Sequence, residues 1–308
     1  VWGGRRLELI YGRQLPKDRL IGESLELSAV PGQESVVAAG ALQGWTVSQL
    51  TETYGEQLLG RHIWKRHEGR FPLLIKLIDA SEDLSVQVHP DDRYVRDQNL
   101  GHFGKAEAWF ILHSGKGRVA HGFKRRVDAD GFYAAIASGR AEKLLNYASV
   151  QAGDLVQTPP GTVHAICRGV MLYEIQQNSD LTFRIYDYGR LGANGRPREL
   201  HLDRALAVVN YDSDPPPVSR HDSDGGPDHD RLLDGEHFRL DLHRGSGKFH
   251  AKSRFRALTL LGGTARLQGE KSRFVLRPAD TYLIPAGRRF AVEPLDEDRL
   301  EYLLATPA

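Results

Sequence analysis

The sequence predicts a mainly β fold, and three observations carry this prediction. Apolar runs are short, rich in β-branched and aromatic residues, and each ends near a turn residue. The 32 glycines and 15 prolines are spread along the chain, as in proteins built from many short strands. The regular alternation of strand and helix that marks a parallel sheet is missing. These features favour a β barrel or sandwich, and 308 residues allow one large or two smaller domains.

Each expected element follows from a local pattern. Strands are expected at 73–77, 84–88, 109–112, 155–158 and 170–175. Apolar residues recur at helical spacing over 128–147, which predicts a helix there. A second helix is expected at 197–210, with Pro197 near its start, and a third at 46–59, with Thr46 as its N-cap. We therefore expect helical insertions in the N-terminal part of a β scaffold.

The domain organisation is predicted from one polar segment. Residues 212–230 contain six Asp, four Pro and two Gly, and such a composition cannot bury a core of its own. We expect residues 1–211 to form the larger domain, 212–230 a linker or exposed loop, and 231–308 a smaller domain. Strands in the smaller domain are expected at 237–242, 257–261, 264–267, 281–284 and 300–304.

An internal echo links the two domains. Residues 153–164 read GDLVQTPPGTVH and residues 279–290 read ADTYLIPAGRRF. Both place an Asp, a strand and Pro-x-Gly at the same spacing, which indicates two copies of one β unit. The alternative is chance recurrence of Pro-x-Gly turns. Phe290 stands where the first copy has His164, so only the first copy is expected to hold a site.

Composition excludes several classes of function. Lys plus Arg is 41 and Asp plus Glu is 40, and this balance argues against a nucleic-acid partner. Cys167 is the single cysteine, so an intrachain disulfide and a cysteine-built zinc site are excluded. No apolar run reaches the length of a membrane span and no apolar leader opens the chain. We expect a cytoplasmic protein without a membrane partner.

Two short segments carry polar residues on strand faces. In LSVQVHPDD, alternation places Ser85, Gln87 and His89 on one face and two valines on the other. The competing interpretation is a solvent-facing edge strand. In GKAEAW, Lys105 and Glu107 share a face, although a surface ion pair would produce the same pattern.

A histidine after a Pro-Pro-Gly turn completes a possible ligand set. His164 could also be a core histidine with its hydrogen bonds satisfied. Imidazole and carboxylate suit zinc or another first-row divalent ion, and a weak fourth ligand leaves room for substrate. The candidate set is Gln87, His89, Glu107 and His164.

One further segment, YEIQQNSDLTFRIYDYGR, places charges among strand formers. Glu174, Arg184 and Arg190 lie in it. Paired charges on an exposed strand would explain them, but cations beside a metal set also suit a phosphorylated or carboxylated substrate.

Ordered motifs then carry a resemblance to a known family. Residues 153–164 resemble the second cupin motif, with Arg168 where many cupins have Asn. In order, LSVQVHPDD, GKAEAW, PPGTVHAI and EIQQNSDLTFRIYDYGR resemble type I phosphomannose isomerase in its short bacterial form. GESLELS at 22–28 is similar to the family's G-E-x-W-E-x-S, with Leu25 in place of Trp. The resemblance covers residues 1–210 well, and the C-terminal part only as a second, degenerate barrel.

The resemblance implies a fold, a reaction and roles for residues. The fold would be two cupin (jelly-roll) barrels, and the reaction a zinc-dependent interconversion of mannose 6-phosphate and fructose 6-phosphate. One Zn²⁺ per chain would be bound by His89, Glu107 and His164, with Gln87 as a fourth ligand. Arg184 matches the family's catalytic arginine, and Lys105 and Glu174 are further catalytic candidates. Positions that bind substrate or its phosphate in relatives are Ser85, Lys105 and Arg190. Ala106 replaces the usual Thr or Ser, and its side chain is expected to point away from the pocket.

The implied chemistry leaves some alternatives open. An aldose–ketose shift moves a proton between C2 and C1 through a cis-enediol, and it needs a base. The base could be Lys105, Glu174, a histidine or water on the metal. Competing functions are another cupin phosphosugar isomerase or epimerase, a non-haem iron oxygenase, and a non-catalytic cupin sugar-binding protein. The expected partner is a small phosphosugar, and the protein is expected to be a monomer or homodimer.

Overall fold

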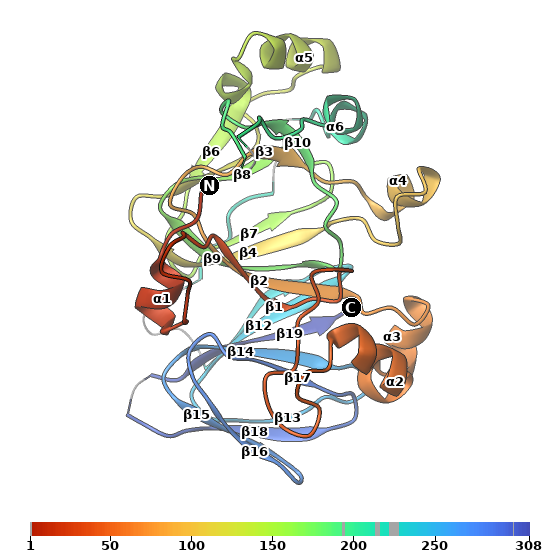
Figure 1. The fold of residues 1–308 in the computed structure, drawn as a ribbon, viewed down its shortest axis with the longest axis vertical. Helices are drawn as coiled ribbons and strands as arrows, with labels where there is room; N and C mark the ends of the chain where they lie inside the picture. Colours follow the sequence, from red (N-terminus) through yellow and green to blue (C-terminus); the bar gives the residue numbers. More distant parts are fainter. Residues whose placement is uncertain (1, 193–194, 213–215, 222–227, 298) are drawn as a thin grey trace. The chain divides into compact units, whose positions relative to one another are not determined.

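The computed structural model describes residues 2–192, 195–212, 216–221, 228–297 and 299–308. Strands predominate over helices, which confirms the predicted mainly β class (Figure 1). The helices are α1 (Arg6–Tyr11), α2 (Val47–Leu59), α3 (Arg61–Arg66), α4 (Asp92–Asp97), α5 (Ala129–Ala137), the 3-10 helix η1 (Ala141–Leu144) and α6 (Leu202–Val208). Among the described residues, no helix is both long and apolar enough to cross a membrane.

The strands form four antiparallel sheets. Those before residue 190 are β1 (Glu23–Leu27), β2 (Leu73–Asp79), β3 (Val86–Val88), β4 (Glu107–Ser114), β5 (Arg118–Phe123), β6 (Leu145–Ser149), β7 (Leu155–Thr158), β8 (His164–Ile166), β9 (Val170–Gln177) and β10 (Phe183–Tyr186). Those after it are β11 (His229–Asp234), β12 (Phe238–Arg244), β13 (Gly247–His250), β14 (Arg256–Gly262), β15 (Ala265–Gly269), β16 (Arg273–Leu276), β17 (Thr281–Ile284), β18 (Arg289–Pro294) and β19 (Glu301–Pro307).

The chain divides into two compact units by its internal contacts. The first unit comprises residues 1–24 and 76–221, and the second comprises 25–75 and 222–308. Residues 25–75, which we expected in the N-terminal domain, therefore group with the C-terminal residues. Backbone hydrogen bonds explain the grouping, because Leu58 O accepts from Ala286 N and Leu59 O accepts from Phe255 N. Of the predicted linker 212–230, residues 213–215 and 222–227 lie outside the described residues.

The strands that lie wholly within the first unit belong to two sheets. They follow the order β9-β4-β7 in one sheet and β10-β3-β8-β5-β6 in the other. Trp109, Leu172 and Ile166 belong to an apolar cluster drawn from both sheets. Val86 and Val88 point to the other side of β3, into a cluster with Phe132 of α5 and residues of α6. Figure 1 shows α5 and α6 beside β6, β3 and β10. Opposite faces of β3 therefore have different surroundings, as its alternation predicted.

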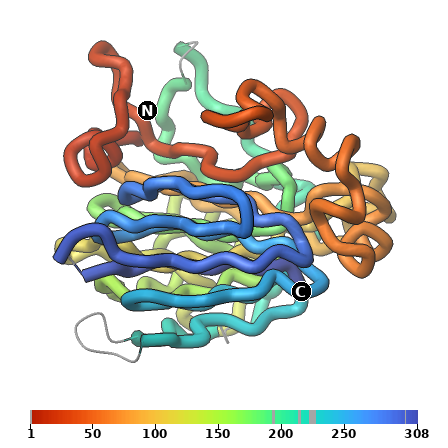
Figure 2. Tube along the Cα trace, turned by 90° about the horizontal axis from the view of Figure 1, so that it is seen from below, coloured from red at the N-terminus to blue at the C-terminus, as the bar shows by residue number. Residues whose placement is uncertain are grey.

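The second unit is built from two sheets and the α2–α3 helices. The sheets have the orders β11-β12-β19-β14-β17 and β13-β18-β15-β16. Figure 2 shows these C-terminal strands, drawn in blue, running side by side. Leu258 and Leu304 from the first of these sheets and Leu267 and Val292 from the second pack in one apolar cluster.

Both units use the same strand order. The series β2-β9-β4-β7 and β3-β8-β5-β6 recurs as β12-β19-β14-β17 and β13-β18-β15-β16. Each strand from β2 to β9 thus has a counterpart, in the same chain order, from β12 to β19. The two echo sequences lie on counterparts, 153–164 on β7 and β8 and 279–290 on β17 and β18. The echo therefore reflects a repeated β unit rather than chance.

Helix predictions met with mixed outcomes. The helix at 46–59 is confirmed as α2, and Thr46 forms a reciprocal capping box with Gln49. The helix predicted over 128–147 is wrong at its end, because Leu145–Ser149 forms β6 and pairs with β5. The helix predicted over 197–210 is shorter than expected, since α6 begins at Leu202.

Candidate metal and active site

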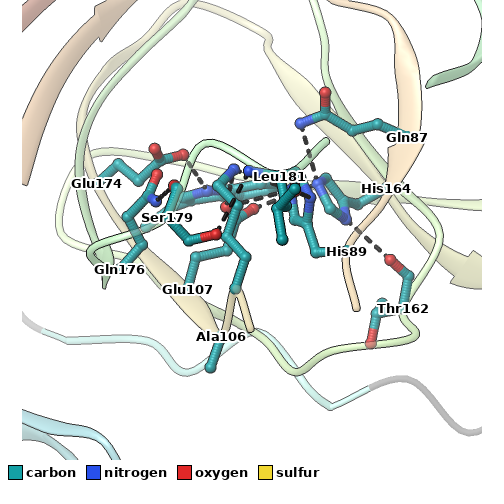
Figure 3. A network of polar contacts seen from close by, with 12 residues as sticks. Gln87, His89, Ala106, Glu107, Thr162, His164, Glu174, Gln176, Ser179 and Leu181 are labelled. Carbon is teal, nitrogen blue, oxygen red and sulfur yellow. Dashed lines mark hydrogen bonds and ion pairs between the residues drawn. The ribbon is translucent and has the colours of Figure 1, made fainter. Parts of the chain in front are cut away.

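The four residues predicted as metal ligands converge in the first unit. Gln87 lies on β3, His89 follows its end, and Glu107 and His164 open β4 and β8. Candidate ligand atoms of His89, Glu107 and His164 all lie within 4.8 Å of one another. The side-chain amide of Gln87 lies 3.1 Å from His164 Nε2. Figure 3 shows these side chains together, with Gln87 to one side and Glu174 to the other.

Backbone carbonyls orient both imidazole rings. His89 Nδ1 donates to Leu181 O at 2.9 Å, and His164 Nδ1 donates to Thr162 O at 2.8 Å. These bonds place each ring proton on Nδ1, so each Nε2 carries a lone pair that can accept a hydrogen bond or bind a metal ion. The two Nε2 atoms lie 3.4 and 3.2 Å from the carboxylate oxygens of Glu107. Two nitrogen lone pairs and a carboxylate therefore face one point.

The electrostatics of the cluster suit metal ligands. Burial, together with Lys105, lowers the pKa of His89 to about 3, and burial also lowers the pKa of His164. Burial would raise the pKa of Glu107, but Lys105 and the two histidines hold it well below its ordinary value. At neutral pH the imidazoles are neutral and the carboxylate is ionised, which is the state a metal ion requires.

The donor set fits a divalent metal ion. Glu107 Oε1 is buried and has no hydrogen-bond partner. Two imidazole nitrogens and a carboxylate form an arrangement found in catalytic zinc sites. Gln87 can present its amide oxygen after a flip that leaves the side chain's shape unchanged. Gln87 is therefore placed to act as a weak fourth ligand beside His89, Glu107 and His164.

Lys105 occupies the centre of this cluster. Its Nζ donates to His89 Nε2 and to Glu107 Oε2, both at 2.9 Å. Lys105 N donates to Pro90 O, and Gly104 packs so closely that a Cβ would lie 2.5 Å from the backbone of Asp91. The turn before β4 is thus fixed by a close backbone approach that only glycine allows. An ion bound to the histidines would have to displace the ammonium group from His89 Nε2.

Ala106 takes no part in the cluster through its side chain. Its backbone N–H donates to Gln177 Oε1 at 2.9 Å, and Gln177 Nε2 donates to Asp92 Oδ1 at 2.9 Å. The substitution that distinguishes this chain from the family pattern therefore falls at a position held by its main chain.

Glu174 lies in a second group of buried charges, together with a residue that the sequence did not reveal. Glu174 is 3% exposed, and its Oε2 accepts from Trp109 Nε1 at 3.1 Å. Lys76 Nζ lies 3.5 Å from Glu174 Oε1 and 3.5 Å from Glu23. Burial, followed by Glu107, raises the pKa of Glu174. A lysine within the apolar strand LLIKLID was the sequence signal, because a charge in a buried strand needs a partner.

Arg184 is positioned beside the predicted ligands. It pairs with Gln87 in the register between β10 and β3. Its Nη1 donates to Glu199 O at 2.9 Å, whereas its Nε is buried without a hydrogen bond. His201 holds its backbone from both sides: Arg184 N donates to His201 Nδ1 at 3.2 Å and His201 N donates to Arg184 O at 2.8 Å.

The predicted substrate residues differ in their surroundings. Ser85 is 4% exposed and precedes β3 on the same alternating face as Gln87. Arg190 is engaged elsewhere: its Nη2 lies 2.5 Å from Asp187 Oδ1, its Nη1 donates to Asp83 O, and its guanidinium stacks on Tyr188. Arg190 therefore has fewer free donors than Arg184.

The second unit lacks these ligands at the matching positions. The echo aligns His164 with Phe290 and Thr158 with Ile284. Phe290 pairs with Phe249 as His164 pairs with Gln87, and Ile284 pairs with Arg256 as Thr158 pairs with Glu107. Gly287 N donates to Ala251 O as Gly161 N donates to His89 O. The four counterparts are Phe249, Ala251, Arg256 and Phe290.

Comparisons with known proteins agree with the motifs. A family model described as phosphomannose isomerase type I, catalytic domain, matches residues 1–103. The mannose-6-phosphate isomerase ManA of Bacillus subtilis is 34% identical over 295 residues, or 93% of this chain and 90% of that protein. The mannose-6-phosphate isomerase of Streptococcus mutans is 32% identical over 288 residues, or 92% and 89%. The crystal structure of the mannose 6-phosphate isomerase from Bacillus subtilis superposes with a TM-score of 0.85 at 30% identity, covering 99% of this chain and 95% of that one.

Proposed function

The chain belongs to the type I phosphomannose isomerase family, and on this premise we propose that it interconverts mannose 6-phosphate and fructose 6-phosphate. The observation that carries the proposal is the buried His89, Glu107 and His164 cluster with Lys105 at its centre. The named relatives that share most of the chain's length are mannose-6-phosphate isomerases. A small phosphosugar is therefore the proposed substrate.

The proposed cofactor is one Zn²⁺ per chain, bound by His89, Glu107 and His164 with Gln87 as the fourth ligand. Two observations support this assignment: Glu107 Oε1 is buried without a hydrogen-bond partner among the described residues, and both Nε2 atoms carry lone pairs directed at the cluster. When bound, the ion would polarise the substrate's oxygen atoms as a Lewis acid.

Two buried side chains are proposed to act on the substrate, one by proton transfer and one by hydrogen bonding. Glu174 is our candidate for the base that moves the proton between C2 and C1 through a cis-enediol. Burial disfavours its charged form, which favours uptake of a proton, and Lys76 Nζ at 3.5 Å from its Oε1 favours the return of that proton. Lys105 is buried at the ligands and is proposed to donate hydrogen bonds to the substrate's oxygen atoms.

Arg184 is proposed to stabilise negative charge that develops on the substrate. Its unpaired Nε lies on the strand beside Gln87, and a fixed cation there would favour an enediolate. Ser85 and Lys105 are the proposed substrate contacts. Arg190 is proposed to join them in phosphate binding once one of its bonds to Asp187 or Asp83 has opened.

A coupled assay that follows fructose 6-phosphate tests the function. We expect turnover of mannose 6-phosphate, its loss on exhaustive chelation and its recovery with Zn²⁺. Glucose 6-phosphate and other aldose phosphates serve as a specificity panel. Full activity without metal would refute the zinc role, and turnover of another phosphosugar alone would refute the substrate.

A matched pair of variants tests Arg184. Arg184→Ala should lower kcat by at least about 100-fold, the magnitude for a group that stabilises developing charge. The control is Arg125→Ala, because Arg125 is exposed in the same unit. Wild-type turnover in Arg184→Ala would remove it from the mechanism.

The finer architecture is also a proposal. We infer that each unit contains a cupin barrel, and that the barrel formed by residues 231–308 is the degenerate one without metal ligands. The shared strand order and the replacement of each ligand by Phe249, Ala251, Arg256 or Phe290 support this. A cytoplasmic location and a monomeric or homodimeric state remain predictions.

A further inference from the structure

One ligand position of the first unit is occupied by a hydrogen-bond donor in the second unit, because Arg256 is the counterpart of Glu107. On β12 and β19, Arg239 pairs with Thr306 and Asp241 pairs with Leu304. On β14 and β19, Ala257 pairs with Ala305, which places Arg256 beside Thr306. Strand alternation puts Arg239, Thr306 and Arg256 on one face. This row, Arg239–Thr306–Arg256, is called the arginine row below.

Two members of the arginine row have buried polar atoms without partners. Arg256 Nε and Thr306 Oγ1 are both buried, and neither has a hydrogen-bond partner in the part of the chain that the structure describes. Thr306 is only 7% exposed. Nearly all buried polar groups in folded proteins are paired, so two orphans on adjacent strands need an explanation. Both groups can donate a hydrogen bond to an oxygen atom.

The charges around the row are not balanced. Arg231, Arg239 and Arg256 face two carboxylates, Asp234 and Asp241. Asp234 lies 2.5 Å from Arg239 and 3.2 Å from Arg231. Asp234 and Asp241 thus form ion pairs with Arg231 and Arg239, and the positive charge of Arg256 has no such partner among the described residues.

Asp241 does not satisfy Arg256. Its Oδ1 accepts from Arg231 Nε and lies 3.0 Å from His229 Nε2. No ion pair within 4.0 Å joins Asp241 to Arg256 among the described residues. Burial lowers the pKa of Arg256, and Arg231 and Arg239 lower it further, against the opposing effect of Asp241. Among the described residues, the Arg256 guanidinium therefore has no direct ion-pair partner, and Asp241 acts on it only through space.

We propose that the arginine row binds one compact oxyanion of the phosphate type, held by Arg256, Thr306 and Arg239. Such an anion would satisfy both orphaned donors and supply the missing negative charge. The Arg239 side chain is 42% exposed, so the site is open to solvent at that end. Arg256 stands at the counterpart position of Glu107, so the repeated β unit would hold a cation in one copy and an anion in the other. This proposal does not depend on the isomerase activity.

Thermal unfolding of the full chain tests the site. Inorganic phosphate should raise the melting temperature of the wild type above that in sodium chloride of equal ionic strength, by about 2–4 °C near saturation. In Arg256→Gln this phosphate increment should fall by at least half. The control Arg277→Gln, at an exposed arginine of the same unit, should retain it. An equal increment in all three proteins would overturn the proposal.

Two further measurements separate this site from the isomerase site. Thr306→Val keeps the side chain's shape and should weaken phosphate binding several-fold without unfolding the protein. The Nε–H resonance of Arg256 is identified by ¹⁵N NMR as the one that is absent in Arg256→Gln. In the wild type this resonance should shift saturably with phosphate, and an unshifted resonance would refute the site. Sulfate and acetate arms distinguish tetrahedral oxyanions from carboxylates. Without phosphate, Arg256→Gln should isomerise mannose 6-phosphate at the wild-type rate. If the wild-type protein shows no isomerase activity, the proposed function is refuted, and the resonance shift still decides whether the second unit binds phosphate.

Discussion

Lys105→Met should destabilise the metal-free protein strongly and the metal-loaded protein only slightly. Lys105 is 4% exposed and Glu107 is 1% exposed. The ammonium group donates to Glu107 Oε2 and His89 Nε2, both at 2.9 Å. In the metal-free protein it is therefore the cation that compensates the buried carboxylate. Methionine has a similar length and no charge, so the substitution removes that compensation with little change in volume.

The magnitude follows from the burial of the pair. Removal of one partner from a buried ion pair costs about 3–5 kcal/mol, because the other charge is left uncompensated. A divalent ion at the ligand atoms would neutralise Glu107, so most of that loss should vanish when the metal is bound. A difference of about 3 kcal/mol between the two states corresponds to metal binding on the order of 100-fold tighter.

Urea unfolding with and without chelator measures the two stability changes, and a competition titration with a chelating dye measures zinc affinity. Lys116→Met is the matched control, because Lys116 is exposed in the same unit. We expect the loss of unfolding free energy to be large only in chelator, together with raised zinc affinity and lost isomerase activity. Equal destabilisation in both conditions, with unchanged zinc affinity, would refute the assignment of Lys105 as the compensating cation.

Three further predictions test separate parts of the molecule. Thr46→Ala should lower the free energy of unfolding by about 1 kcal/mol in urea, because Thr46 caps α2 through Gln49. His201→Ala should lower kcat more than His201→Asn, since the Asn oxygen can still accept the Arg184 N–H; equal losses would contradict a positioning role. Burial lowers the pKa of His243 to about 4. Between about pH 6.5 and 4 the unfolded chain therefore binds a proton that the folded chain does not, and the free energy of unfolding decreases as the pH is lowered. His243→Gln should flatten the slope of unfolding free energy over that window, and an unchanged slope would refute the contribution.

The parts of the site that could be predicted from sequence depend on local geometry. Alternation along β3 separates Gln87 from its valine neighbours whatever the strand packs against. The Thr46 cap follows from a four-residue pattern. The echo between residues 153–164 and 279–290 indicated the repeated unit, because the turn that joins β7 to β8 recurs between their counterparts β17 and β18. Such features require no knowledge of distant residues.

The parts that could not be predicted depend on distant partners. Residues 145–149 continue an apolar pattern, yet they form a strand because β5 offers an edge for pairing. Lys76 became a site residue only when Glu23 and Glu174 were brought to it from other strands. Arg190 was assigned to a phosphate from the family resemblance, but its guanidinium is bonded to Asp187, three residues away, and to Asp83 O from a distant part of the chain. Partners that are far apart in sequence contribute to each of these cases.

The two copies of the β unit show how the interior of one scaffold can be stabilised in different ways. In the second unit Phe249 and Phe290 stack at 5.0 Å on counterpart strands, so apolar contact fills the positions of Gln87 and His164. In the first unit those positions carry polar groups whose burial is unfavourable unless they are paired. Gln87 and His164 contact each other, and Thr162 O accepts from His164 Nδ1. The strand order and the apolar clusters are common to both units, so the interior positions could change while the framework remained. A charge buried in such an interior must be compensated by whatever binds there, and for that reason Glu107 predicts a cation and Arg256 an anion.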